Sequence, residues 1–226
     1  SMGGIPMNKD GHVRKNNTEY VEGFYAAGEC SCSSVHGANR LGANSVLEAL
    51  LFGRFVGKTM VADVDGIKLR VATQADAQRM IDEVEWALTN HGQEHVPTLR
   101  DELQQSMTDN AGVFRTKETL TTQMNIIEDL RKRYKNIRVS DKSKIFNTEL
   151  QEAIEFGHML DYSLFIVASA LARQESRGAH FREDFPTRDD ENFLKHTMAY
   201  MDENGTISLD YMDVTLGKHE LKARTY

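Results

Sequence analysis

Residues 160–171 read L-D-Y-S-L-F-I-V-A-S-A-L, so that apolar side chains point to almost every side of a helix. This stretch forms the second half of a helix that we expect from Asn147 to about Arg173. A helix without a polar face is usually buried among other elements. The stretch therefore predicts the central helix of a helical domain.

Three further segments repeat apolar residues at helical spacing and predict the helices around it. The stripes are Ala77, Met80, Ile81, Val84 and Leu88; Leu99, Leu103 and Met107; and Leu120, Met124, Ile127 and Leu130. Pro97 suits the first turn of a helix, and residues 110–112, Asn-Ala-Gly, predict a break between the second and third helices. Because apolar stripes are how bundles bury a core, we expect core packing here rather than cofactor binding.

The first 62 residues differ in character, since they hold nine of the sixteen glycines. Residues 23–29, G-F-Y-A-A-G-E, predict a short buried strand that ends in the carboxylate of Glu29. A strand or two and one helix do not bury a sheet, so we expect the closing piece of a larger α/β domain. The fold is predicted to be mainly α, with this strand-helix piece (1–62), a three- to four-helix bundle (74–178) and a C-terminal strap or tail (179–226).

Composition excludes several classes of protein. The 226 residues are 40% hydrophobic and 27% charged, which is typical of a globular domain. The net charge of -7 argues against nucleic-acid binding, and the basic residues 131–133 end a helix. Cys30 and Cys32 are too close for a comfortable disulfide and too few for a zinc site. The longest apolar run, residues 164–172, is far shorter than the roughly 20 residues that span a bilayer.

Residues 36–45, H-G-A-N-R-L-G-A-N-S, place Arg40 among small residues just before an apolar helix. A guanidinium in such surroundings suits a carboxylate, which it binds through two parallel hydrogen bonds. The alternative is an arginine that ties down its loop through backbone carbonyls. His36 is a candidate acid or base, although a single histidine is more often a packing or hydrogen-bonding residue.

Ser45-Val46-Leu47-Glu48 fits a capping box and predicts a helix from Val46 to about Met60. The box would leave the amides of Val46 and Leu47 free to face an anion or a ring oxygen that gains negative charge. Water is the alternative partner. Glu29 suits sugar-like hydroxyls, unless it is an ordinary surface carboxylate.

Residues 23–29 and 36–45 closely resemble the late flavin-binding and substrate motifs of the flavoprotein subunit of succinate dehydrogenase and fumarate reductase. The resemblance continues through residues 175–180, 185–192 and 224–226, so it covers both ends of the chain. It identifies residues 1–62 as the C-terminal remnant of the FAD-binding domain. His180 lies within the third segment and is a candidate for seating the tail on that domain.

The resemblance implies a role for each residue singled out above. Glu29 would hold the ribityl or ribose part of FAD, Ser45 and Val46 would contact the flavin ring, and Arg40 would bind a carboxylate of the substrate. The implied reaction is hydride transfer between succinate and the flavin, with electrons passed to an iron-sulfur subunit and a quinone-reactive membrane anchor. It implies a peripheral position at the cytoplasmic face of the bacterial inner membrane. No metal site is implied for this chain.

Several family features lie outside this sequence. It has no G-x-G-x-x-G, no histidine for covalent flavin attachment and no capping domain, and the family's substrate histidine would precede Met2-Gly3-Gly4. We therefore expect a C-terminal fragment that neither binds FAD well nor turns over alone, and we assign no certain catalytic residue. L-aspartate oxidase shares the H-G-A-N-R segment and is an enzymatic alternative. A non-catalytic helical module that docks a partner subunit is the other.

Overall fold

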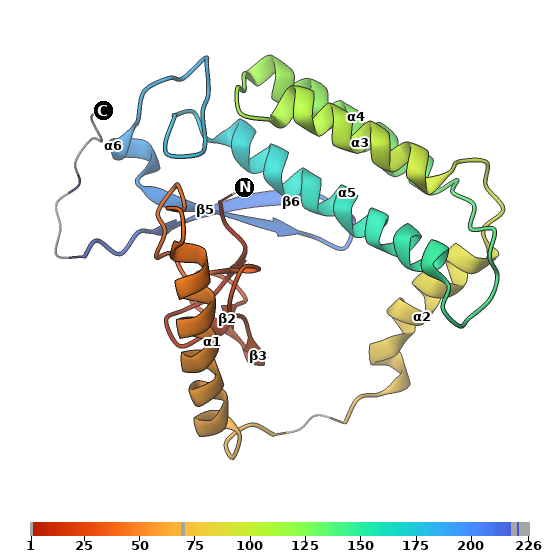
Figure 1. The fold of residues 1–226 in the computed structure, drawn as a ribbon, viewed down its shortest axis with the longest axis horizontal. Coiled ribbons are helices and arrows are strands. Elements are labelled where there is room, and N and C mark those ends of the chain that lie inside the picture. Colours follow the sequence, from red (N-terminus) through yellow and green to blue (C-terminus); the bar gives the residue numbers. More distant parts are fainter. Residues whose placement is uncertain (1, 69–70, 218–220, 222–226) are drawn as a thin grey trace.

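A long central helix organises the larger part of the molecule (Figure 1). The computed structural model describes residues 2–68, 71–217 and 221. Helix α5, Thr148–Ala172, begins at Asn147, whose side-chain oxygen accepts a hydrogen bond from the Leu150 amide at 2.8 Å. It contacts α2 (Gln74–Thr89), α3 (Val96–Ala111), α4 (Lys117–Tyr134) and a C-terminal hairpin. The predicted central helix is confirmed.

The bundle core lies between α3, α4 and α5. Its fully buried side chains include Leu99, Leu103, Leu120, Ile127, Leu130, Phe156, Leu160, Leu164 and Val167. The second and third predicted stripes therefore form core. Pro97 occupies the first turn of α3, and that helix ends at Ala111 beside Gly112, as expected.

The first predicted stripe is only partly buried, and the expectation that it belongs to the core is wrong for most of its length. Met80 is 71% exposed and Ala77, Ile81 and Val84 are also exposed, whereas Leu88 is buried. The reason is that only the C-terminal end of α2 packs on α5. The first turns of α2 stand away from the bundle (Figure 1). The helix itself forms as predicted and is capped by Thr73 and Asp76.

The length and composition of α5 would also suit a membrane span. Its contacts with three helices and a hairpin account for much of the apolar sequence, although only 33% of the most apolar 18 residues are buried.

The N-terminal part contains two small pairs of strands and one helix. Strand β1 (Ile5–Pro6) runs parallel to β4 (Ser31–Cys32), and β2 (His12–Arg14) pairs antiparallel with β3 (Tyr20–Tyr25). The buried strand predicted at residues 23–29 is therefore wrong. The strand lies earlier and its side chains are mostly exposed, and Gly28, at a φ of 81°, turns the chain before Glu29.

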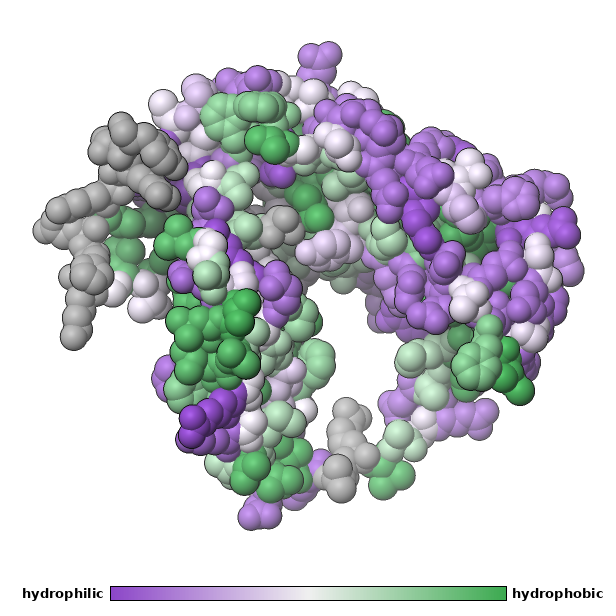
Figure 2. All heavy atoms as spheres, viewed as in Figure 1, coloured by the Kyte–Doolittle hydropathy of each residue, from purple (hydrophilic) through white to green (hydrophobic). Residues whose placement is uncertain are grey.

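Helix α1, Asn44–Asp63, follows these strands and buries only Glu48 and Val56. The exposed large apolar residues on it are Val46, Leu47, Leu50, Leu51, Phe55, Met60 and Val61. They form much of the apolar surface of this helix (Figure 2). Such a face is typical of a helix that another part of a larger domain covers, although the predicted division at residues 62, 74 and 178 stays a prediction.

The C-terminal region is more ordered than the predicted strap or tail. A short helix α6 (Asp190–Phe193) precedes a hairpin of β5 (Lys195–Met201) and β6 (Ile207–Asp213), which packs on α5. Met201 and Ile207 join the bundle core, and Met198 is buried. The strap around 185–192 is held on the segment that follows α5, where the Ser176 amide donates to the Thr187 carbonyl at 3.1 Å and the Asp189 amide donates to Glu175 Oε2 at 2.9 Å. The resembling residues 224–226 lie outside the described residues.

Candidate functional site

Three of the predicted site residues meet at the start of α1. The Arg40 Nη1 donates to Glu29 Oε1 at 2.8 Å and approaches Ser45 Oγ at 3.4 Å. Its Nη2 lies 3.9 Å from the carboxylate of Glu48. The Arg40 side chain is only 15% exposed, whereas that of Glu29 is 82% exposed. The turn at Gly28 therefore presents a solvated carboxylate to a mostly buried guanidinium.

The guanidinium of Arg40 is incompletely satisfied. Its Nε is buried and, within the described part of the chain, donates no hydrogen bond. Within the described residues, the guanidinium donates to the side chains of Glu29 and Ser45, which does not support the alternative of a loop tied down through carbonyls. A buried donor without a partner costs free energy, so the Nε side of the Arg40 guanidinium fits an additional acceptor such as a carboxylate.

Glu48 is the buried centre of the same site, and the sequence reasoning assigned it only to a helix cap. It is 5% exposed; its Oε1 accepts from Ser33 Oγ at 2.7 Å, and its Oε2 lies 2.5 Å from His36 Nε2. Burial alone would raise the pKa of Glu48. The hydrogen bonds from Ser33 and His36 and the charge of Arg40 outweigh burial and hold that pKa below its ordinary value.

The geometry therefore gives His36 a hydrogen-bonding role toward Glu48. Its side chain is 12% exposed, so most of the imidazole is covered by the loop and the helix. The candidate role of His36 as an acid or base stays a prediction.

The predicted capping box at Ser45 is wrong. Helix α1 begins at Asn44, and the residue at its N-cap is Ala43 in the left-handed conformation with no side-chain cap bond. Ser45 instead faces Arg40, and the Glu48 carboxylate turns toward Ser33 and His36, so both members of the box are engaged elsewhere. The first-turn amides consequently lack a side-chain cap and keep their capacity to face an anion.

These residues fit the groups of a flavin cofactor. Glu29 offers a solvated acceptor for hydroxyls, and the uncapped helix start at Ser45 offers donors to a ring oxygen. Val46 is 66% exposed at that start, so its side chain is open to an incoming planar group. Each predicted residue thus lies at the same end of α1.

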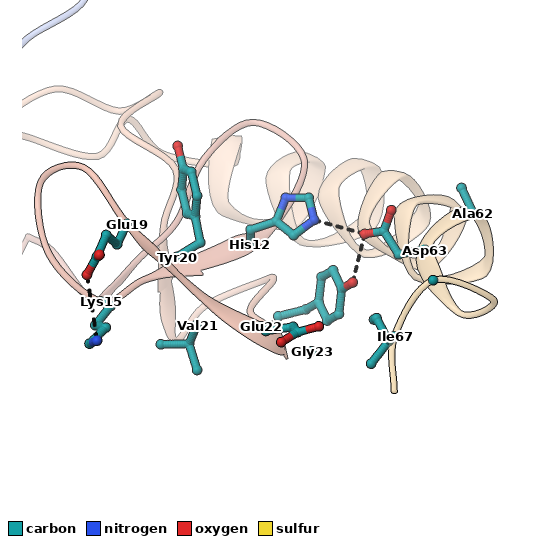
Figure 3. A pocket seen from close by; sticks show the side chains of 12 residues that line it. His12, Lys15, Glu19, Tyr20, Val21, Glu22, Gly23, Ala62, Asp63 and Ile67 are labelled. Atoms are coloured by element: carbon teal, nitrogen blue, oxygen red, sulfur yellow. Dashed lines mark hydrogen bonds and ion pairs between the residues drawn. The ribbon is translucent and has the colours of Figure 1, made fainter. Parts of the chain in front are cut away.

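An open pocket of about 780 Å³ lies at the opposite end of α1 and contains none of the predicted site residues (Figure 3). His12 Nε2 lies 2.9 Å from Asp63 Oδ2, and Tyr25 donates to the same oxygen at 2.7 Å. The Tyr25 hydrogen bond is the main cause that lowers the pKa of Asp63. The three side chains join the β2–β3 hairpin to the last turn of α1.

No group of three or more histidine, cysteine, aspartate or glutamate residues with metal-binding geometry occurs in residues 2–68, 71–217 and 221. Cys30 and Cys32 are both free thiols.

Comparisons with known proteins identify the family of the chain. Residues 100–226 match the family described as fumarate reductase flavoprotein C-term, and residues 1–46 match an FAD-binding domain. The chain is 42% identical to the succinate dehydrogenase flavoprotein subunit of Rickettsia conorii over 224 residues, covering 96% of this chain and 37% of that protein. It is 39% identical to the fumarate reductase flavoprotein subunit of Escherichia coli, covering 96% and 36%.

A solved structure of FrdA from E. coli quinol fumarate reductase, a mutant form, aligns with a TM-score of 0.90 at 37% identity, over 99% of this chain and 38% of that one. The fold and these matches thus define part of an FAD-dependent flavoprotein. Within that class, the chain belongs to the family of succinate dehydrogenase and fumarate reductase flavoprotein subunits. It spans 37% of the length of the Rickettsia relative.

Proposed function

We propose that this chain is the C-terminal part of a respiratory flavoprotein subunit that interconverts succinate and fumarate with FAD. The observation that carries the proposal is the mostly buried Arg40 guanidinium beside the start of α1. Among the described residues, no side chain caps that helix start and none accepts from the Arg40 Nε. A guanidinium can bind a planar carboxylate through two parallel hydrogen bonds, and both proposed substrates, succinate and fumarate, are dicarboxylates.

Each residue of the site has a distinct task in this proposal. Arg40 binds one substrate carboxylate and fixes the distance of the carbon chain from the cofactor. Glu29 accepts hydrogen bonds from FAD hydroxyls, and the helix start at Ser45 and Val46 faces the flavin ring. FAD supplies the hydride chemistry when bound. Glu48 and His36 hold the loop and the helix start together, so that the fork is oriented before substrate arrives.

The Glu29–Arg40 ion pair has a consequence for the order of binding. Glu29 occupies Nη1 of Arg40 at 2.8 Å. When FAD hydroxyls draw Glu29 away, the two outer edges of the guanidinium become available to a carboxylate. Cofactor binding would thereby prepare the substrate site.

The proposed partners are an iron-sulfur subunit and, through it, a quinone-reactive membrane anchor. The named structural neighbours support this part of the proposal, because they include a quinol-fumarate reductase with menaquinol molecules and a Mycobacterium smegmatis Sdh1 complex. A peripheral position at the cytoplasmic face of the bacterial inner membrane would follow, with electrons leaving the flavin toward the iron-sulfur subunit.

The full-length flavin-loaded subunit provides the test. Succinate-dependent dye reduction, fumarate-dependent oxidation of a reduced dye and aspartate-dependent peroxide formation are measured for wild type, Arg40→Ala and Arg40→Lys. We expect the wild-type subunit to show both the succinate and the fumarate activity. In each Arg40 variant, kcat/KM for both substrates should fall on the order of 100-fold or more. Arg79→Ala, an exposed arginine of α2, is the matched control and should keep wild-type activity.

The remaining outcomes separate the alternatives. Activity with aspartate alone would identify an L-aspartate oxidase. Succinate and fumarate activities that do not respond to Arg40 would contradict its role as the substrate anchor. A folded, flavin-loaded protein without any of these activities would favour the non-catalytic docking module.

A further inference from the structure

The loop that carries Arg40 rests on a turn from the far end of the chain. The Ala179 amide donates to the Ala38 carbonyl at 2.9 Å. Gly178 stands at a φ of +60°, and a Cβ built there would lie 2.3 Å from the Ala38 oxygen and 2.4 Å from its carbonyl carbon. The backbone of residues 178–179 therefore packs directly on the backbone of Ala38, two residues before Arg40, and leaves no space for a side chain at residue 178.

A second contact reaches the same loop from strand β5. The His196 Nε2 lies 2.8 Å from Ser34 Oγ. Ser34 adopts a φ of 66°, which is unusual for a residue with a side chain, so its backbone conformation needs support from surrounding contacts. His196 provides such a contact at the beginning of the loop, while Gly178 provides one in its middle.

The turn at Gly178 is itself anchored on a buried carboxylate. Glu175 is 0% exposed and accepts hydrogen bonds from Arg173 and from Arg177, the latter at 2.8 Å and 2.9 Å. Arg177 also binds Asp190 at 2.7 Å, and its amide donates to the His180 carbonyl at 2.8 Å. These bonds fix the turn against the end of α5 and against α6. The surface that Ala38 meets is consequently a rigid one.

We infer that Gly178 and His196 are positioning residues for Arg40, so that the C-terminal region sets the affinity of the site for a dicarboxylate. The inference rests on the proposed function, because it takes Arg40 as the carboxylate anchor. A side chain at residue 178 would displace Ala38 and with it the guanidinium. Since a two-point hydrogen bond depends on alignment, a shift on the order of 1 Å should weaken carboxylate binding strongly.

The experiment uses the full-length flavin-loaded subunit with Gly178→Ala and a matched glycine variant. Gly205→Ala is the control, because Gly205 also has a positive φ, at +77°, but a Cβ there meets only the flexible end of the Arg131 side chain. Two quantities are measured: the Kd of malonate, a dicarboxylate that does not react, and KM and kcat for succinate.

We expect Gly178→Ala to raise the Kd of malonate and the KM of succinate roughly tenfold or more, with a much smaller change in kcat. Gly205→Ala should leave both constants within about twofold, although it carries a similar backbone strain. An unchanged Kd in Gly178→Ala, or equal increases in the two glycine variants, would overturn the inference.

A second pair of variants keeps the test decisive if Gly178→Ala does not fold. His196→Leu removes the hydrogen-bonding partner of Ser34, whereas His196→Gln retains an amide that can take its place. We expect His196→Leu to raise the Kd of malonate and His196→Gln to restore it toward wild type. Equal effects of the two would overturn the inference.

Measurements on the wild-type subunit and Arg40→Ala distinguish a failure of the proposed function from a failure of this inference. A wild-type subunit that binds malonate through Arg40 but does not turn over succinate would refute the proposed reaction, while the malonate constants would still decide the positioning role. A wild-type subunit in which Arg40→Ala does not change malonate binding would overturn both.

Discussion

Replacing Asp184 by asparagine should lower the free energy of unfolding in a pH-dependent way. Asp184 accepts two hydrogen bonds of 2.8 Å from the guanidinium of Arg182. Arg182 is 1% exposed and also donates to the Ala170 and Leu171 carbonyls at 3.0 Å and 3.1 Å. These carbonyls end α5, so the guanidinium serves as its C-terminal cap. Asp184 in turn orients and neutralises the buried cation.

The magnitude follows from the ionisation of Asp184. The Arg182 hydrogen bond is the main cause that lowers the pKa of Asp184 from 3.8 to about 2. A shift of this size corresponds to about 2 kcal/mol of stability at pH 7. Because the folded-state pKa is the lower one, the contribution is complete above pH ~4 and is lost as the pH falls through about 2.

Urea denaturation followed by circular dichroism measures this contribution. Asp184→Asn should be less stable than wild type by about 2 kcal/mol at pH 7 and by about 1 kcal/mol at pH 3. Asp101→Asn, at an exposed position of α3, is the control and should change stability by less than about 0.5 kcal/mol. A loss of equal size at both pH values would refute the ionic explanation, and so would no loss at pH 7.

Three further predictions concern other parts of the molecule. Tyr25→Phe should raise the pKa of Asp63, because it removes the largest cause of the lowering; NMR titration of the carboxyl group would contradict this if the midpoint stayed in place. Leu160→Ala, at a site 1% exposed, should cost about 2–5 kcal/mol in urea denaturation, whereas Met80→Ala, at 71% exposed, should cost less than about 0.5 kcal/mol. Equal losses of stability in Leu160→Ala and Met80→Ala would contradict the difference in burial between α5 and the first turns of α2. Asn147→Ala should cost about 1 kcal/mol by removing the cap of α5, and a neutral result in the same assay would mean that the 2.8 Å bond contributes little.

The bundle was predictable because residues 160–171 place apolar side chains on almost every side of a helix. The same reasoning failed for Met80, since helical spacing identifies an apolar face but not the element that covers it. The hairpin of β5 and β6 was not predicted, although Asn204-Gly205 is a known hairpin signal. Burial does not alternate along β5, so the strand lacks the usual period of two.

The site was predictable in part. The motif of residues 36–45 singled out Arg40 and Ser45, and in the structure the Arg40 guanidinium contacts both Ser45 and Glu29. Glu48 was misread, because S-x-x-E describes a capping box equally well whether or not the glutamate has stronger partners. Ser33 and His36 supply those partners through tertiary contact, which spacing along the chain does not reveal. For the same reason, the contacts of Gly178 and His196 with the Arg40 loop could be found only in three dimensions.

The most direct test of the central claim is a structure of the full-length subunit with FAD and malonate bound, in which the distances from the Arg40 guanidinium to the ligand are measured. We predict two hydrogen bonds of about 2.7–2.9 Å from Arg40 to one malonate carboxylate, with Glu29 turned to the FAD hydroxyls. Malonate bound elsewhere, with Arg40 still paired to Glu29, would contradict this prediction.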